Sequence, residues 1–300
     1  MHPDVFPDGA SARQEPAARE HAWQHRGVTA HGPQVIAHRG ASAVEPEHTL
    51  AAYVEAIKTG ADGLECDVRL TADGHLVCVH DRKVSRTSNG VGLVSTLELT
   101  QLEGLDWGSW KALAARADRA GARDDGEEPD VVTRDDRSHL LTLARLCQLV
   151  ADTDRRVELL VETKHPTRYG GLVERKLAEL LQQYGWDEAP DGPVRVMSFS
   201  LLAVRRIRQL APAVPRIFIM ERSIPLPFRD GSLPPGVGTA AVAVQILRDQ
   251  PGYARRVHDR GHQLYVFTVD DLADVDRCLA AGVDAIITNR PADVLEHLKR

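Results

Sequence analysis

Residues 35–68 of this chain read VIAHRGASAVEPEHTLAAYVEAIKTGADGLECDV. The stretch opens and closes with short apolar runs at 35–37 and 63–68, and residues 49–59 between them place apolar side chains at helical spacing. A strand, a helix and a second strand in this order are typical of a parallel sheet with helical crossovers. The stretch therefore predicts the first unit of an α/β fold.

The same alternation continues to the end of the chain. So many units favour a closed TIM-type (β/α)8 barrel over an open sheet. The strand candidates number nine, one more than such a barrel needs, and the sequence leaves open which of them lies outside it. The further predicted strands are 75–79, 157–162, 194–198, 216–220, 240–245, 263–269 and 285–288, and the further predicted helices are 140–151, 171–184, 201–210, 253–260, 273–281 and 292–299.

Three stretches do not follow the repeat. Residues 82–139 are predicted to be an insertion after the third strand, and the charged residues 114–137 within it are expected to form a loop. Residues 223–238 hold several Pro and Gly and are expected to form another lip of the pocket. Residues 1–33 lack periodicity and are expected to be a disordered N-terminal arm. One barrel domain is therefore predicted over residues 34–300.

Composition narrows the classes of partner. The chain has 300 residues, 43% hydrophobic and 27% charged, with a formal net charge of -6. This mildly acidic balance gives no electrostatic footprint for nucleic acid or for an anionic membrane, so an anionic small-molecule substrate would have to be attracted by a local positive site. No apolar run resembles a secretion signal or is long enough to span a bilayer, so we expect a cytoplasmic protein without stable membrane insertion. The four cysteines lie in apolar runs without metal-ligand spacing and are expected to be buried free thiols.

Carboxylates stand near the ends of two predicted strands. Glu65 and Asp67 are two residues apart, so both point to one face of their strand, and Glu162 and Lys164 repeat this spacing further along the chain. Three carboxylates that converge at barrel strand ends suit Mg2+ or Ca2+, and without a cation they would repel one another. The sequence therefore predicts a divalent-cation site of Glu65, Asp67 and Glu162. The simpler alternative is an ion pair between Glu162 and Lys164 at the barrel rim.

Two histidines also follow predicted strands. His38 and His80 each precede a charged residue, Arg39 and Asp81, and a histidine pair can supply a general acid and a general base near neutral pH. Arg39 and Lys164 place positive charge beside the carboxylates, where they would bind phosphate oxygens. A cation, two cationic side chains and two proton carriers together indicate phosphoryl chemistry. We expect Asp81 to orient a loop or His80.

A series of motifs in fixed order resembles the glycerophosphodiester phosphodiesterase family. It covers most of residues 34–300, and although no single triplet is specific, the ordered set is. The motifs are HRG at 38–40, EPEHT at 45–49, GADGLECDV at 60–68, TADGHLVCVHD at 71–81, RTSNG at 86–90, VETK at 161–164, MSF at 197–199, FTVD at 267–270 and GVDAIITNRP at 282–291.

This resemblance implies a TIM-type barrel and metal-dependent cleavage of glycerophosphodiesters to sn-glycerol 3-phosphate and an alcohol. It implies that Glu65, Asp67 and Glu162 hold the cation and that His38 and His80 are the acid–base pair. By the same resemblance Arg39, Lys164 and Phe267 contact substrate, and Glu47 supports the metal or His38. The family usually has Asn at the position of His48 and commonly Trp at the position of Phe267.

Two other functions remain open at this stage. A lysophospholipase D would use the same site and need an apolar groove for an acyl chain, which residues 82–139 or 223–238 would supply. A non-catalytic barrel that binds an anion would keep the cationic side chains but cleave nothing. The leaving alcohol, the oligomeric state and the nucleophile, whether water or a neighbouring glycerol hydroxyl, are not determined by the sequence.

Overall fold

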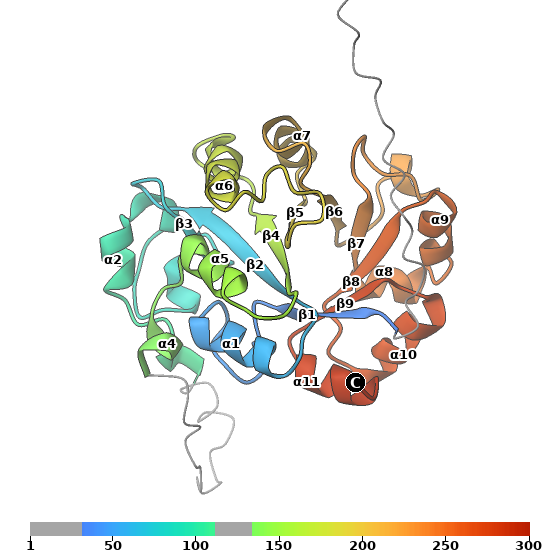
Figure 1. The fold of residues 1–300 in the computed structure, drawn as a ribbon, viewed down its shortest axis with the longest axis horizontal. Helices are drawn as coiled ribbons and strands as arrows, with labels where there is room; N and C mark the ends of the chain where they lie inside the picture. The colour runs from blue at the N-terminus through green and yellow to red at the C-terminus, as the bar shows by residue number, and fades with distance from the viewer. Residues whose placement is uncertain (1–31, 112–133) are drawn as a thin grey trace, which may run out of the picture.

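Eight parallel strands close into a barrel with helices around it (Figure 1). The computed structural model describes residues 32–111 and 134–300. The barrel order is β1, β2, β4, β5, β6, β7, β8, β9, and β1 pairs with both β2 and β9 to complete the ring. These strands are β1 Gln34–His38, β2 Gly63–Leu70, β4 Glu158–Thr163, β5 Val194–Ser198, β6 Arg216–Met220, β7 Thr239–Ala243, β8 Gln263–Phe267 and β9 Ala285–Thr288. The predicted TIM-type barrel is confirmed.

The ninth predicted strand lies outside the barrel. It is β3, Leu76–Cys78, which pairs antiparallel with β2. A tight turn at residues 71–75 joins the two, with Gly74 at a φ of 90° and the Thr71 amide bonded to the His75 carbonyl. Since this turn has no room for a crossover helix, the chain can only return antiparallel. The insertion follows β3, as predicted.

Helices fill the remaining connections between the barrel strands. Three of them begin at hydroxyl caps, α1 at Thr49, α5 at Thr142 and α7 at Ser200. The last two residues of the predicted strand 240–245 instead begin α8, because a strand-to-helix turn leaves no sequence gap there. The α-helices are α1 Leu50–Lys58, α2 Leu99–Glu103, α4 Arg134–Ser138, α5 Leu143–Ala151, α6 Leu172–Gln183, α7 Leu201–Leu210, α8 Val244–Asp249, α9 Tyr253–Asp259, α10 Leu272–Ala281 and α11 Pro291–His297, and the 3-10 helices are η1 Val84–Arg86, η2 Val94–Thr96 and η3 Leu226–Phe228.

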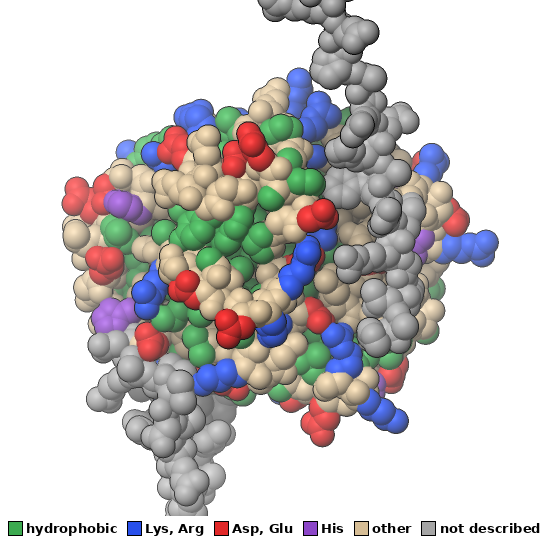
Figure 2. Space-filling model, in the orientation of Figure 1, with side chains coloured by type: hydrophobic (Ala, Val, Ile, Leu, Met, Phe, Trp, Pro, Cys, Tyr) green, Lys and Arg blue, Asp and Glu red, His purple; other side chains and the backbone are tan. Residues whose placement is uncertain are grey.

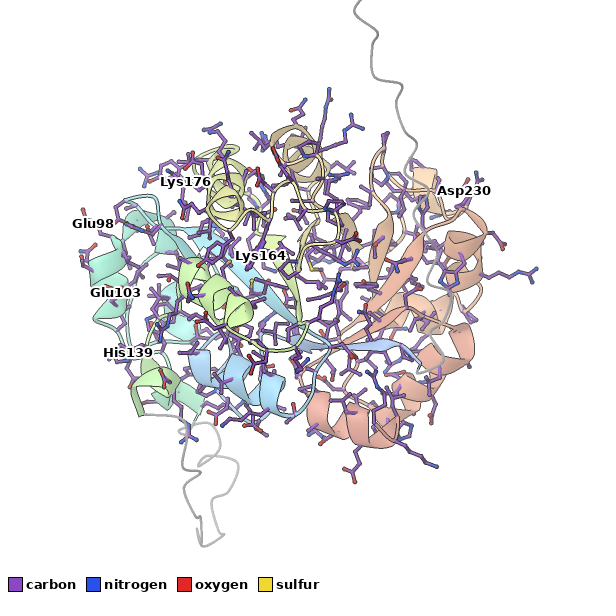
Figure 3. All side chains as sticks on the ribbon, in the orientation of Figure 1. Glu98, Glu103, His139, Lys164, Lys176 and Asp230 are labelled. Atoms are coloured by element: carbon purple, nitrogen blue, oxygen red, sulfur yellow. The ribbon has the colours of Figure 1, made fainter. Side chains whose placement is uncertain are left out.

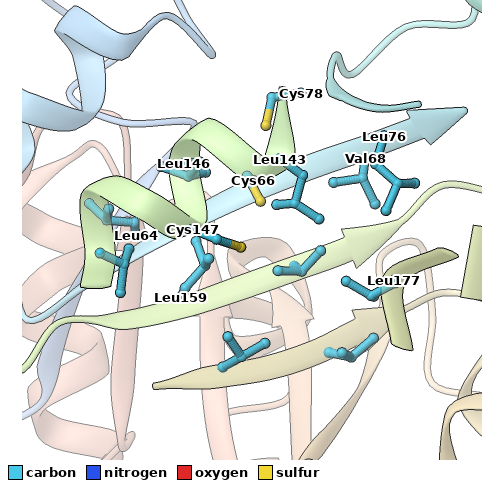
Figure 4. Close-up of a cluster of buried hydrophobic side chains, with 14 of the residues drawn as sticks. Leu64, Cys66, Val68, Leu76, Cys78, Leu143, Leu146, Cys147, Leu159 and Leu177 are labelled. Atoms are coloured by element: carbon cyan, nitrogen blue, oxygen red, sulfur yellow. The ribbon is translucent and has the colours of Figure 1, made fainter. Parts of the chain in front are cut away.

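Side chains of the barrel strands alternate between two layers. On β2, Leu64, Cys66 and Val68 point outward and pack against α5 and α6 (Figure 4). The residues between them, Glu65 and Asp67, therefore point into the barrel. A separate apolar cluster fills the interior, and it includes Ile36, Leu160, Met197, Ile217 and Tyr265. The carboxylates of β2 thus lie next to this apolar cluster, at the carboxyl end of the barrel interior.

The insertion and the β3 segment before it share a small core. Val77, Val79, Val84, Val94, Leu102 and Trp107 are all buried there. Most of the predicted charged loop and nearly all of the predicted N-terminal arm lie outside the described residues, although residues 134–137 of that loop form the start of α4. All four cysteines are buried and free, as predicted.

The described surface carries both signs of charge. Figure 2 shows acidic and basic side chains interspersed on one face, around a patch of hydrophobic side chains that lies between α5 and α6. Within residues 32–111 and 134–300, no helix combines the length and apolar character that crossing a bilayer requires.

Candidate active site

The predicted site residues meet at the carboxyl ends of the first barrel strands. His38 on β1 lies in register with Glu65 on β2, and Asp67 on β2 lies in register with Glu162 on β4. In a parallel barrel the same ends of neighbouring strands converge, so side chains distant in sequence come together.

His80 reaches this group although β3 lies outside the barrel. The hairpin brings the chain back along β2, and the Val79 amide donates to the Asp67 carbonyl at 3.0 Å. The Arg69 guanidinium then donates to the His80 carbonyl at 2.9 and 2.6 Å. The antiparallel return therefore delivers His80 to the same end of β2 that carries the carboxylates.

Three buried carboxylates form one cluster. Glu65, Asp67 and Glu162 each offer an oxygen, and these oxygens all lie within 4.8 Å of one another. Burial and the charge of Asp67 raise the pKa of Glu162 to about 8, and the same causes raise the pKa of Glu65 well above its usual range. Ionising all three at once is therefore unfavourable unless additional positive charge is present.

Asp67 is surrounded by the side chains of two cationic residues and a histidine. Its oxygens lie 3.1 Å from Arg39 Nε, 2.9 Å from His48 Nε2 and 2.8 Å from Lys164 Nζ. Although burial alone would raise it, the Lys164 charge, the His48 hydrogen bond and the Arg39 charge hold the pKa of Asp67 well below its usual range. Its Oδ1 atom is nevertheless buried without a well-aligned hydrogen bond among the described residues. Asp67 is thus ionised, and its Oδ1 has the Lys164 ammonium as an ion-pair partner at 2.8 Å.

Lys164, the residue directly after β4, contacts the cluster. Its Nζ lies 2.7 Å from Glu162 Oε1, and the side chain is visible beside β4 in Figure 3. The ion pair that the sequence offered as the simpler alternative is therefore present, but it forms part of the carboxylate cluster and does not replace it.

The backbone after β1 is shaped for this site. Arg39 has a φ of 59°, and its amide donates to Glu65 Oε2 at 3.1 Å. Gly40 follows at a φ of 83°, and a Cβ there would lie 2.6 Å from Ala52 of α1. Only glycine satisfies both the left-handed backbone and the close approach of α1. The triplet HRG thereby holds Arg39 over Glu65 and Asp67.

His38 is held from the opposite end of the chain. Its Nδ1 lies 2.7 Å from Asn289 Oδ1, while Asn289 Nδ2 donates to Asp270 Oδ2 at 2.6 Å. Since the Asn289 amide faces a carboxylate on its nitrogen side, its oxygen must accept from His38, so Nδ1 carries the proton and Nε2 is left with a lone pair. Burial and the Arg39 charge lower the pKa of His38 to about 4.

His80 is held by a carboxylate. Its Nδ1 lies 2.7 Å from Asp81 Oδ1, and Arg86 bridges Asp81 to Glu47 at 2.6 to 2.8 Å. Glu47 also accepts from Arg39 at 3.0 Å. Although burial would raise it, the Arg86 hydrogen bonds and the Arg39 charge lower the pKa of Glu47 to about 2. Glu47 therefore links the loop after β1 to the insertion that carries His80.

Phe267 lies at the carboxyl end of another barrel strand. It ends β8 and meets Phe199 edge to face, with ring centroids 6.3 Å apart. Lys164 Nζ lies 5.9 Å from the Phe199 ring centroid. Lys164 therefore lies between the aromatic pair and the carboxylate cluster.

Three polar residues here were given no role by the sequence analysis. They are Asn289, Asp270 and Ser42, whose hydroxyl lies 2.8 Å from both Asn289 Oδ1 and the His38 carbonyl. Asn289 follows β9 directly, so the rule that singled out His38, a polar residue after an apolar run, would also have selected it.

Comparison with known proteins gives a consistent result. Residues 38–293 match the Glycerophosphoryl diester phosphodiesterase family. A Mycobacterium tuberculosis protein named "Probable glycerophosphodiester phosphodiesterase 1" is 45% identical over 275 residues, which cover 90% of this chain and 93% of that protein. The Bacillus subtilis glycerophosphodiester phosphodiesterase is 31% identical over 88% of this chain and 86% of its own length.

A solved structure has the same fold. It is an Oleispira antarctica phosphodiesterase in complex with the product sn-glycerol-3-phosphate. The two chains superpose with a TM-score of 0.74 at 25% sequence identity, covering 89% of this chain and 97% of the other.

Proposed function

The chain belongs to the glycerophosphoryl diester phosphodiesterase family and is a glycerophosphodiester phosphodiesterase, and from this premise we propose how its residues carry the reaction. The substrate is a glycerophosphodiester, which is hydrolysed to sn-glycerol 3-phosphate and an alcohol. The observation that carries the proposal is the convergence of three buried carboxylates, two cationic side chains and His38 at one end of the barrel. The family match and the relatives named as phosphodiesterases argue against the non-catalytic alternative.

The carboxylate cluster fits a divalent cation. Glu65, Asp67 and Glu162 would hold it, because hard oxygen ligands suit Mg2+ and Ca2+ and an Asp67 oxygen lacks a well-aligned partner among the described residues. A cation bound there supplies positive charge that polarises the phosphoryl group. Arg39 and Lys164 border the same cluster and would bind the phosphate oxygens.

The two histidines have different surroundings, which suggests different roles. His38 donates to a neutral amide and keeps a lone pair on Nε2, so it would accept the proton of the attacking water or glycerol hydroxyl. His80 contacts the Asp81 carboxylate, which favours its protonated form, so it would donate a proton to the leaving alcohol oxygen as the phosphorus–oxygen bond breaks. Burial, with the charges of Lys164 and Arg39, lowers the pKa of His80 below its usual value, although the Asp67 charge and the Asp81 hydrogen bond oppose that shift.

Substitution of the histidines tests these roles. His38→Ala and His80→Ala should each lower kcat by about 100-fold or more, which is the usual size of general acid–base catalysis. His75→Ala is the control, because His75 is an exposed histidine outside the site. Near wild-type turnover in both site variants would refute the mechanism.

Metal dependence has its own test. Activity on glycerophosphocholine and glycerophosphoethanolamine is measured after EDTA treatment and after adding back Mg2+ or Ca2+. Loss with EDTA and recovery with one metal supports the carboxylate site. Full activity in EDTA, with no metal left by elemental analysis, contradicts it.

A lysophospholipase D activity has one observation in its favour. Apolar side chains are exposed after several barrel strands, among them Phe199 and Leu202 after β5 and Leu226 after β6, with exposed fractions of 41%, 62% and 75%. Leu226 lies in the stretch 223–238 that was expected to form a lip. Comparing glycerophosphocholine with a long-chain lysophosphatidylcholine decides between the two substrates.

A further inference from the structure

A second pocket adjoins the candidate active site. It lies between the end of β2, the insertion and the start of α6, and it spans roughly 390 Å³ including its open mouth. Lys164 lines it and also contacts the carboxylate cluster, so the pocket begins where the phosphate would bind. Nothing in the proposed mechanism uses the rest of its wall.

The wall of this pocket is positively charged. Arg69, Arg82 and Arg168 line it together with Lys164, and none of the described residues that line it is Asp or Glu. In the described part of the chain, no carboxylate forms an ion pair with any of the three arginines. Arg69 is occupied by the His80 carbonyl, whereas Arg168 lies over the Tyr169 ring at 5.5 Å. Three arginines without a carboxylate partner among the described residues therefore line one pocket of a chain whose net charge is -6.

The pocket also holds an unused polar group. The Thr167 hydroxyl is buried and has no hydrogen-bond partner among the described residues. Buried hydroxyls are normally bonded, so an orphan beside three arginines indicates a position for a ligand oxygen. Val94 and Val173 supply apolar wall next to it. An anion with a small carbon skeleton matches both kinds of surface.

The pocket lies beside His80, and this position indicates which part of the substrate would enter the pocket. Arg69 bonds the His80 carbonyl and Arg82 follows Asp81 in the chain, so the pocket lies on the side of the histidine that would protonate the leaving alcohol. The glycerol half is neutral and would gain little from arginines. We propose that this pocket is a subsite for a leaving alcohol that carries a second phosphate, and that the enzyme prefers such glycerophosphodiesters. The inference rests on the proposed function.

A matched pair of substrates tests the proposal. Glycerophosphoinositol and glycerophosphoinositol 4-phosphate differ only in the second phosphate. The wild-type enzyme should show a kcat/KM higher by about tenfold for the phosphorylated substrate, because two exposed charge pairs contribute up to about fivefold each. Raising the salt concentration from about 50 to 500 mM should reduce this ratio, since exposed charges are screened.

Variants separate the pocket from the catalytic site. In Arg82→Gln/Arg168→Gln the substrate ratio should fall toward one, whereas it should stay at the wild-type value in Arg255→Gln, an arginine on α9 that is 88% exposed. Three results would overturn the inference while the proposed function stands. They are a wild-type ratio of kcat/KM values near one, a ratio unchanged in the double variant, and a ratio that does not respond to salt. Cleavage of neither substrate, nor of glycerophosphocholine, overturns both.

Discussion

Asn289 offers the sharpest test of how the barrel holds its candidate base. Its amide oxygen accepts from His38 Nδ1 at 2.7 Å, and its amide nitrogen donates to Asp270 at 2.6 Å. Asn289→Ala removes both bonds, so the imidazole of His38 loses the contact that fixes its proton on Nδ1. Asp270 keeps its bonds from the Thr288 hydroxyl and the residue 289 amide, so the β9 end should remain folded.

The size of the effect follows from these contacts. A buried donor left without its acceptor costs about 1–3 kcal/mol, and a tenfold change in rate corresponds to about 1.4 kcal/mol. Part of this free-energy cost destabilises the free enzyme, and the rest raises the activation free energy of the reaction. We therefore expect kcat to fall by about 10- to 100-fold with KM changed little, because Asn289 would act through His38 and not through the substrate.

Steady-state kinetics on glycerophosphocholine measures this, with thermal unfolding as the check on folding. Asn89→Ala is the control, since this exposed asparagine caps a turn in the insertion. The decisive comparison is the double variant His38→Ala/Asn289→Ala, which should be no slower than His38→Ala. If the two losses multiply instead, Asn289 acts independently of His38 and the reasoning is wrong.

Four further predictions follow from the same geometry. Because the pKa of Glu162 is raised to about 8, this carboxyl holds a proton at neutral pH that a cation must displace, and the affinity for Mg2+ should rise from about pH 6 to 8. Calorimetry of Mg2+ binding in two buffers should detect proton release at pH 7. Binding without proton release would contradict this prediction. The pKa of Glu47 is lowered to about 2, so the stabilisation from its ionised form is present above its unfolded pKa near 4.5 and is lost as pH falls toward 2. Glu47→Gln should therefore lower the free energy of unfolding by about 2 kcal/mol at pH 7 and by little at pH 2.5. An equal loss of stability at both pH values would refute this prediction. Leu159→Ala should cost about 2–5 kcal/mol in urea unfolding, because Leu159 is fully buried between the barrel and its helices; a loss under 1 kcal/mol would mean that the site collapses freely. His48→Asn should retain most activity and His48→Ala should not, because Asn tolerates the φ of 62° and can still donate a hydrogen bond to Asp67. Equal kcat values in the two variants would contradict a role for the hydrogen bond to Asp67.

Most of the barrel was predictable from local patterning. The strands 194–198, 216–220 and 285–288 were predicted with the bounds that the structure has, because each is a short buried run between turn signals. The strand at 263–269 ends two residues earlier than predicted, at Phe267. Apolar character continues past its end, so periodicity alone could not locate the boundary.

The candidate site was predictable to the extent that it uses strand ends. Glu65, Asp67 and Glu162 were grouped because parallel strands bring equivalent ends together, and the structure places their oxygens within 4.8 Å. The basic pocket could not be read in the same way. Arg69, Arg82 and Arg168 come from a strand, a loop and the segment before α6, and no spacing links them.

The amino-acid sequence by itself determined the alternation of strands and helices and the residue types at the strand ends, since both are written in patterns a few residues long. The closed tertiary structure alone decided that β3 turns back outside the ring and still brings His80 to Asp67. It also decided that Asn289, 251 positions from His38 in the chain, would hold that imidazole. Such pairings arise only when the first and last strands join, because nothing in the local chain records which distant segment will become its neighbour.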